Sequence, residues 1–331
     1  MKINLLQNIF WNTEQARIRA GYRLVLLIIA YIAVGAGLEF ILGSLTNPIG
    51  FTIDAPLWFF PILAVVILVP GLLSVWLAGR FLDRRSFKEF GLHFNRQWWI
   101  DLIFGMGLGI ILIAFIFLNQ LAFGWVNIKD IFFVLHPKEL FILPLFIFLF
   151  IFLCVGISEE LVTRGYLLKN LAEGFNLKVI GPKGAIIIGW ILSSVVFGLL
   201  HIDNNNATFL STLNITIGGI FFGICFVLTG KLAIPIGLHI TWNFFMANVF
   251  GFPVSGITIP SEVVTVLKIT QSGPEIWTGG AFGPEGGLLC SLAILLGIIL
   301  TLIWLRPQLK HNKEMLHLPL AYFNRPISKQ Q

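Results

Sequence analysis

The sequence is poor in charged residues and in cysteine. Charged residues make up only 11% of its 331 residues, whereas a soluble globular chain carries roughly 25%. The Lys and Arg residues lie between apolar runs rather than along one face, so the net charge of +6 does not indicate nucleic acid as a partner. The three cysteines lie inside apolar stretches, where we expect them to act as small hydrophobic residues. These features exclude disordered, fibrous and disulfide-stapled classes of protein.

Apolar residues are abundant instead. They make up 57% of the chain and include 32 Phe and 10 Trp, more than one water-facing domain could bury. A membrane-spanning helix needs about 20 mostly apolar residues. We therefore predict an all-α fold, a polytopic membrane helix bundle of about eight transmembrane helices embedded in the lipid bilayer. The predicted spans are residues 24–46, 57–79, 98–124, 141–160, 185–202, 208–229, 232–252 and 286–305.

The positions of Lys and Arg predict the orientation of the bundle. Residues 1–23, 80–97, 161–184, 230–231 and 306–331 hold 19 of the 22 Lys and Arg residues, and the alternate loops hold the other three. Cytoplasmic loops carry such an excess, so we expect both termini in the cytoplasm and a multi-pass protein of the plasma membrane. The N-terminal segment lacks a short hydrophobic core with a cleavage site, which indicates an uncleaved first helix rather than a signal peptide.

Glycines recur in two of the predicted spans. Gly105, Gly107 and Gly109 alternate along one span, but no strand precedes them, so we expect helix packing rather than a phosphate-binding loop. Gly219 and Gly223 are four residues apart in another span, a spacing that favours close approach of a neighbouring helix.

Ionisable side chains inside the spans are the informative ones, because each costs about 3 kcal/mol or more at the centre of a membrane helix. The segment from Ser158 to Arg164 contains two adjacent glutamates and an arginine. Glu160 and Arg164 are four residues apart and can pair across one helical turn. That pairing would leave Glu159 free to face a cavity as a general base. A solvated group of charges at the headgroup boundary explains the same residues equally well.

Two later spans contribute histidines. Phe197 and His201 are four residues apart, as are His239 and Asn243, so each pair shares one face of a helix. An imidazole and an amide side by side could stabilise the oxyanion on an attacked carbonyl. Interfacial or helix-to-helix hydrogen bonding is the alternative. The conjunction of all three clusters in three of the predicted membrane segments favours a catalytic site, whereas the acids Glu39 and Asp101 stand alone.

The sequence leaves a divalent metal open. Two histidines and a carboxylate would make a plausible zinc site, but the helical metalloprotease motif H-E-x-x-H is absent. There is no G-x-S-x-G nucleophile motif, and no cysteine has a histidine at helical spacing in its own span.

These residues resemble the CAAX prenyl endopeptidase and bacteriocin-processing family of intramembrane proteases, also called CPBP or Abi. The acid motif E-E-x-x-x-R matches Glu159, Glu160 and Arg164, with Gly165 after it. The motif F-x-x-x-H matches Phe197 and His201, and H-x-x-x-N matches His239 and Asn243. The order of the motifs and the eight-helix count also fit, over about a third of the chain.

The resemblance implies an intramembrane endopeptidase of a peptide or protein substrate, prenylated or not. Glu159 and His201 would activate a water, His239 and Asn243 would stabilise the oxyanion, and Glu160 with Arg164 would hold the motif helix in shape. The apolar runs and the Lys and Arg distribution divide the chain into a cytoplasmic arm at 1–23, N-terminal membrane helices at 24–140, membrane helices at 141–252, an outer loop at 253–285, a last membrane helix at 286–305 and a cytoplasmic tail at 306–331. The resemblance identifies the helices at 141–252 as the catalytic ones.

Two other functions stay open. A non-catalytic membrane scaffold or bacteriocin-immunity protein of the same family would use the polar cluster only for helix packing. A proton-coupled transporter has less support, because the chain shows no inverted repeats. The predicted spans also carry a conflict for the protease: they place Glu159 and His201 at opposite edges of the membrane, whereas both must reach one water.

Overall fold

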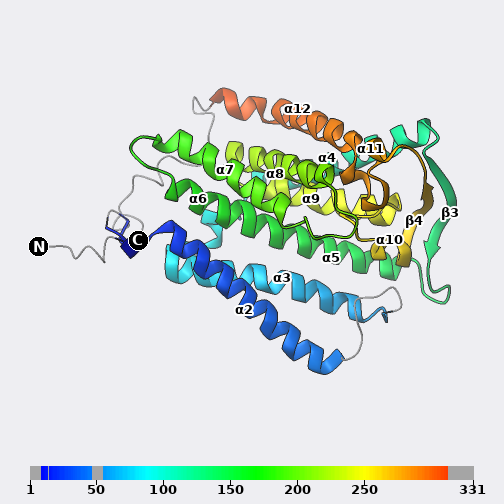
Figure 1. Cartoon of the computed structure of the whole chain (residues 1–331), viewed down its shortest axis with the longest axis horizontal. Coiled ribbons are helices and arrows are strands. Elements are labelled where there is room, and N and C mark those ends of the chain that lie inside the picture. The colour runs from blue at the N-terminus through cyan, green and yellow to red at the C-terminus, as the bar shows by residue number, and fades with distance from the viewer. Residues whose placement is uncertain (1–8, 14, 47–54, 312–331) are drawn as a thin grey trace, which may run out of the picture.

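The computed structural model describes residues 9–13, 15–46 and 55–311. Within this part of the chain, seven helices are long and apolar enough to cross a membrane, and they lie side by side as a bundle (Figure 1). The protein is therefore a multi-pass, all-α membrane protein. The long helices are α2 (Ala20–Thr46), α3 (Phe59–Leu77), α4 (Arg96–Ala122), α5 (Ile142–Glu160), α7 (Gly181–Leu199), α8 (Phe209–Thr229) and α12 (Leu288–His311).

Shorter elements complete the structure. The remaining α-helices are α6 (Lys169–Gly174), α9 (Ala233–Phe244), α10 (Ile259–Val263) and α11 (Glu275–Thr278). Three π-helices occupy Ala78–Asp83, Leu161–Leu168 and Phe245–Val249, and three 3-10 helices occupy Phe87–Phe90, Gly280–Phe282 and Pro284–Gly286.

Two small antiparallel pairs of strands accompany the helices. Strands β1 (Trp11–Asn12) and β2 (Arg17–Ile18) pair before α2, and β3 (Val126–Val134) pairs with β4 (Val264–Gln271). The predicted loops at 125–140 and 253–285 are thus ordered segments joined to each other by a β-ribbon, at the end of the bundle where α4 ends and α5 begins (Figure 1).

The predicted span at 141–160 ends too early. Helix α5 continues without a break through the π-helix at Leu161–Leu168 and through α6, so the candidate membrane span runs from Ile142 to Gly174. Two of the charged residues that ended the hydrophobic run, Glu160 and Arg164, are buried and paired with each other inside the protein. A paired charge does not have to leave the membrane, so the helix continues through it.

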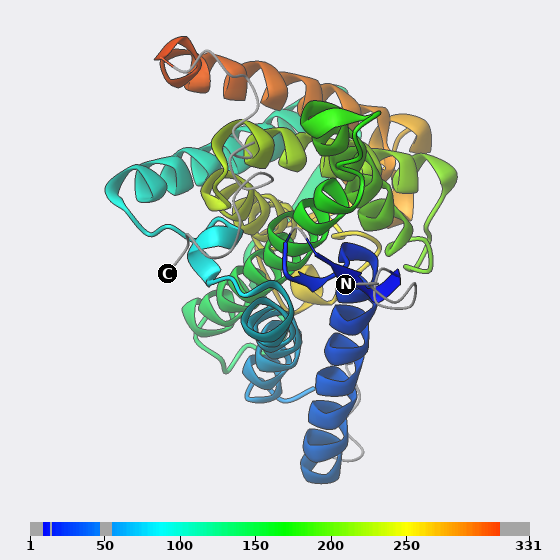
Figure 2. The same cartoon turned by 90° about the vertical axis from the view of Figure 1, so that its left-hand side faces the viewer.

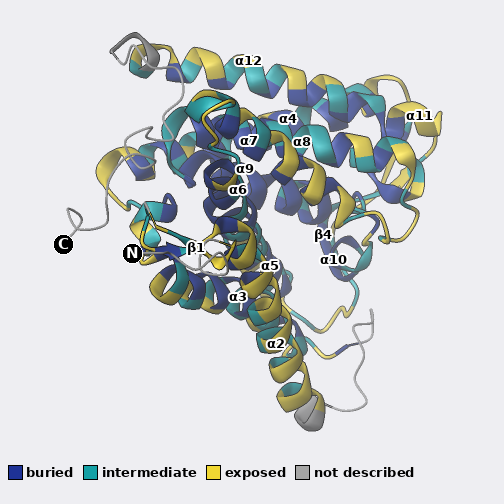
Figure 3. Ribbon diagram, turned by 60° about the vertical axis from the view of Figure 1, so that its left-hand side comes forward, coloured by how far each residue is buried: buried dark blue, intermediate teal, exposed yellow. Residues whose placement is uncertain are grey.

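The predicted span at 232–252 is not one of the seven candidate spans. Helix α9 has 12 residues, all buried, and only the π-helix at Phe245–Val249 extends it. Figure 3 shows α9 in the dark blue of buried residues, enclosed by the long helices. It returns the chain through the interior, so that α2 begins and α12 ends at the same end of the bundle (Figure 1). The assignment of that end to the cytoplasm stays a prediction, and most of the predicted tail at 306–331 lies outside the described residues.

Glycines let α4 and α9 pack with their backbones in contact. A Cβ at Gly109 would lie 2.7 Å from the Leu238 carbonyl oxygen and 2.9 Å from the Trp242 nitrogen, while a Cβ at Gly107 would meet nothing within 4 Å. Gly219 lies against the backbone of Ser194 of α7, and Gly223 lies against the side chain of Trp190. The packing role predicted for these glycines is confirmed, except at Gly107.

This contrast supplies a matched pair of variants. We expect Gly109→Ala to destabilise the protein by about 1–3 kcal/mol, because the added methyl group collides with the backbone of α9. We expect Gly107→Ala to leave stability unchanged or slightly raised, because alanine favours a helix. Thermal unfolding in detergent measures both, and equal unfolding temperatures for the two variants would contradict the close packing of α4 on α9.

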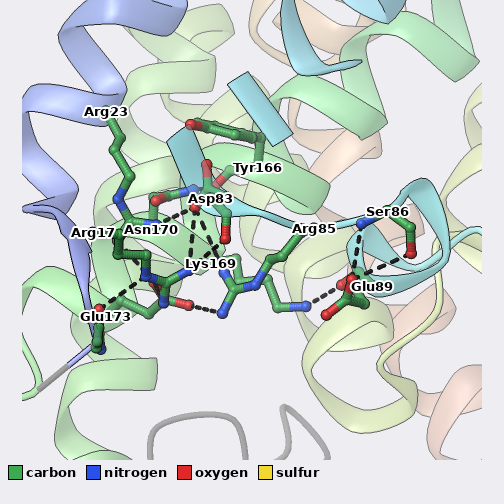
Figure 4. Close-up of polar contacts among 11 residues, drawn as sticks. Arg17, Arg23, Asp83, Arg85, Ser86, Glu89, Tyr166, Lys169, Asn170 and Glu173 are labelled. Atoms are coloured by element: carbon green, nitrogen blue, oxygen red, sulfur yellow. Dashed lines mark hydrogen bonds and ion pairs between the residues drawn. The ribbon is translucent and has the colours of Figure 1, made fainter. Parts of the chain in front are cut away.

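A buried network of ion pairs joins residues before and at the start of α2 to the end of the continuous helix at Ile142–Gly174 (Figure 4). We call this helix the motif helix, because it contains the acid motif. Glu173 of α6 accepts from Arg17 and Arg23, each at 2.9 Å, and Asp83 also pairs with Arg23. Burial lowers the pKa of Arg17 to about 10, and the neighbouring Glu173 opposes this shift. The network fixes the first turns of α2, whose far end diverges from the bundle (Figures 1 and 2).

Candidate active site

Glu160 lies at the centre of the candidate site. Its side chain is fully buried, and one carboxylate oxygen, Oε1, accepts from Arg164 Nη1 at 2.8 Å and contacts His239 Nδ1 at 2.8 Å. The predicted pairing of Glu160 with Arg164 is confirmed. The contact with His239 joins two motifs that are 79 residues apart in the sequence.

Glu159 is on a different face of the same helix. Its side chain is 36% exposed, and its Oε2 lies 3.9 Å from His239 Nε2. Helix α5 changes to π geometry immediately after Glu160, and such π segments often occur at functional sites. The two adjacent carboxylates thus approach the two nitrogens of one imidazole, Glu160 at Nδ1 and Glu159 at Nε2.

The pairing of Glu160 with Arg164 determines which nitrogen of His239 donates to Glu160. A carboxylate paired with Arg164 accepts hydrogen bonds, so Nδ1 of His239 donates to it. An imidazolium at His239 would have a carboxylate at each of its nitrogens, Glu160 at Nδ1 and Glu159 at Nε2. In that charged form, Nε2 also carries a proton and points toward Glu159.

The second motif reaches the same centre through an aromatic ring. Arg164 stacks over the Phe197 ring at 4.2 Å, and that ring lies 6.3 Å from the His239 ring and 5.0 Å from the His201 ring. His201 Nδ1 lies 2.8 Å from the Phe197 carbonyl oxygen. A carbonyl only accepts, so Nδ1 donates and Nε2 of a neutral His201 keeps its lone pair.

Helix packing brings His201 and Glu159 to the same depth. Gly189 of α7 packs against Leu168 and Ala172, which lie nine and thirteen residues after Glu159 along the motif helix. At 1.5 Å per residue, Glu159 is about 14–20 Å from this contact and His201 is about 18 Å from it, in the same direction along two antiparallel helices. The conflict in the predicted spans arose because the span at 141–160 ended too early.

The structure thus brings four of the six predicted residues into direct contact: Glu159, Glu160, Arg164 and His239. His201 joins them through Phe197, and among the described residues no hydrogen bond connects it to Glu159. Asn243 is buried on α9, one turn after His239. The isolated acids do not take part, because Glu39 is exposed on α2 and Asp101 is held by Lys231 at 3.0 Å.

Sequence reasoning missed three neighbours of this group. The Phe222 ring of α8 lies 5.4 Å from the His239 ring and 5.2 Å from the Arg164 guanidinium carbon. Tyr31 of α2 is close enough to Glu159 to interact with it electrostatically. Glu285 accepts from Trp242, the residue before Asn243. The first two are apolar or aromatic residues within hydrophobic runs and carry no signal, but Glu285 is an acid within a glycine-rich stretch.

The donor groups do not fit a metal ion. Within the described part of the chain, no group of three or more His, Cys, Asp or Glu side chains is arranged to hold one. Glu160 is already engaged by Arg164 and His239, and the guanidinium beside it opposes a second cation.

Comparison with known families agrees with the resemblance. Residues 141–245 match a family model described as Type II CAAX prenyl endopeptidase Rce1-like. The match covers about a third of the chain and contains all three motifs, and it confirms the similarity to this protease family expected from them. No curated protein and no solved structure gives a significant match. The family points to a CAAX-type intramembrane protease.

Proposed function

We propose that the protein is an intramembrane endopeptidase that hydrolyses a peptide bond at the bilayer with a water activated by Glu159 and His201. The observation that carries the proposal is the carboxylate of Glu160, which joins the acid motif to His239 and leaves Nε2 of that histidine facing Glu159. Buried ionic groups are expensive in a membrane protein, and a packing role alone does not account for a partly exposed glutamate opposite an imidazole.

The side chains suggest a division of roles. Glu159, with the lone pair of His201 Nε2, takes a proton from water, and the resulting hydroxide adds to the carbonyl carbon of the scissile bond. Nε2–H of the His239 imidazolium and the Asn243 amide donate to the oxyanion that forms. The abstracted proton then passes to the leaving nitrogen, the C–N bond breaks, and a carboxylate and an amine are released.

Glu160 and Arg164 act on His239 rather than on the substrate. The carboxylate holds the proton on Nδ1 and fixes the plane of the ring, as carboxylates do for histidines in other active sites. The substrate is a peptide or protein segment at the membrane, prenylated or unmodified. We extend the proposal to a plasma-membrane protein with both termini in the cytoplasm, on the strength of the Lys and Arg distribution.

The proposal is tested with purified protein in liposomes and a panel of prenylated and unmodified peptides, with the products identified by mass spectrometry. We expect cleavage at one internal peptide bond, at the same rate with and without a chelator. Cleavage that stops in the chelator would contradict the metal-free mechanism. Proton-driven uptake of a solute into the same liposomes, with no cleavage of any peptide, would favour a transporter instead.

A further inference from the structure

The segment at 253–287 consists of the predicted outer loop and the two glycines after it. It lies beyond the matched family region and packs against the candidate site. Its Phe282 is buried in a small cluster with Phe197 of α7 and Ile215 of α8. Phe197 is the residue whose ring lies between His201, His239 and Arg164. The loop therefore contacts the aromatic side chain that connects the second motif to the other two.

Glu285 is the main polar anchor of this loop. Its Oε1 accepts from Trp242 Nε1 at 3.0 Å, and its Oε2 accepts from both the backbone N–H and the hydroxyl of Ser255, each at 2.7 Å. Ser255 has a left-handed backbone with φ 48°, a conformation that costs energy for a residue with a side chain and persists only where contacts fix it. The two bonds from Glu285 supply such contacts.

Ser255 in turn holds the turn that carries His201. Its carbonyl oxygen accepts from Asn204 Nδ2 at 2.9 Å, and the Asn204 backbone N–H donates to the His201 carbonyl at 3.2 Å. Gly256 packs so closely on Asn205 that a Cβ there would collide with the Asn205 backbone. One carboxylate thus connects the His201 turn, through Ser255, to the helix of His239 and Asn243, through Trp242.

A third attachment fixes the backbone of Glu285 itself. Asn214 of α8 donates through Nδ2 to the carbonyl oxygens of Glu285 and Gly287, both at 2.9 Å, and accepts from Ser291 at 2.7 Å. The backbone at Glu285 is therefore attached to α8, while its carboxylate bonds to Trp242 and Ser255. Glu285 thus links the turn of His201 to α9 at a fixed position.

We infer that Glu285 is a positioning residue that sets the distance and angle between His201 on one side of the site and His239 with Asn243 on the other. The inference rests on the proposed peptidase function, since it assigns a role in that reaction to a residue whose carboxylate bonds to Trp242 and Ser255 rather than to the proposed catalytic groups. It also makes the 253–287 loop part of the active site rather than a connection between the helices.

Three variants test this positioning role of Glu285. We expect Glu285→Ala to lower kcat on the best-cleaved peptide of the panel about 10–100-fold, the usual effect of losing a residue that orients a catalytic group, with KM changed less than twofold. Glu285→Gln keeps an acceptor for Trp242 but not the charge, so its kcat should lie between those of Glu285→Ala and wild type. Glu275→Gln alters an exposed acid of the same loop and should behave as wild type.

Hydrogen–deuterium exchange tests the positioning role of Glu285 independently of the proposed peptidase function. In Glu285→Ala we expect faster exchange in peptides covering residues 200–207 and 253–257, with the motif helix at 142–174 unchanged. If wild type cleaves no peptide but these segments exchange faster in Glu285→Ala, the result supports the positioning role of Glu285 and contradicts the peptidase function. Wild-type kcat and unchanged exchange in Glu285→Ala overturn the inference and leave the peptidase function intact. Loosening of the whole protein, without partial rescue by Glu285→Gln, also overturns it, because the role would then be only structural.

Discussion

The Glu159→Gln variant is expected to cleave its peptide about 10²–10⁴ times more slowly than wild type, the range for loss of a general base. The amide has nearly the shape of the carboxylate but cannot take a proton from water. The Glu159 side chain is partly exposed and forms no ion pair shorter than its 3.9 Å approach to His239, so the fold should not depend on its charge. We therefore expect an unchanged unfolding temperature together with an almost complete loss of kcat.

The matched control is Glu39→Gln, which removes another acid of the membrane helices that is exposed and lies outside the site. It should cleave at the wild-type rate. Full activity of Glu159→Gln would remove Glu159 from the mechanism. A loss of activity in step with a loss of folded protein would assign the residue a structural role.

The second large effect is expected on stability, from Arg164→Met. Arg164 and Glu160 have side chains only 1% and 0% exposed. Removing one partner leaves the other charge buried and uncompensated, which costs about 3–5 kcal/mol in folding free energy. The variant also loses the stacking of the guanidinium over Phe197. Chemical denaturation in detergent should show this loss, whereas Arg96→Met, at an exposed position, should have little effect.

A double variant separates the charge from the packing. Glu160→Gln combined with Arg164→Met leaves no uncompensated charge, so it should be more stable than Arg164→Met alone although it carries more changes. It should remain poorly active, because His239 loses the carboxylate at Nδ1. A double variant whose destabilisation equals the sum of the two single effects would show that the pair is not coupled.

Hydropathy identified the membrane helices because lipid demands long apolar runs, but it could not tell lipid-facing from protein-facing surface. Helix α9 is as apolar as a membrane span, yet all 12 of its residues are buried in protein. The predicted span at 141–160 ended too early for the opposite reason. Its charges suggested an exit from the membrane, whereas Glu173 is neutralised by arginines from 150 or more residues earlier in the chain.

Local spacing predicted local contacts in the site. Glu160 and Arg164 are one turn apart on a helix, and their pairing follows from that geometry alone. The contact of Glu160 with His239 and the pairing of β3 with β4 join segments far apart in the sequence, and no spacing rule encodes them. Glu285 was missed for this reason as well, since its partners Trp242 and Ser255 lie 43 and 30 residues away.

The central claim is that Glu159 activates a water for attack on a peptide carbonyl, and the most direct test is cleavage in water enriched in ¹⁸O. Wild type and Glu159→Gln are reconstituted in the same liposomes with the best-cleaved peptide, and the new carboxyl terminus is analysed by mass spectrometry. The account predicts one ¹⁸O atom in the new carboxyl terminus that wild type forms in a single turnover, and almost no product from the variant. Equal rates of labelled product from the two proteins would contradict it.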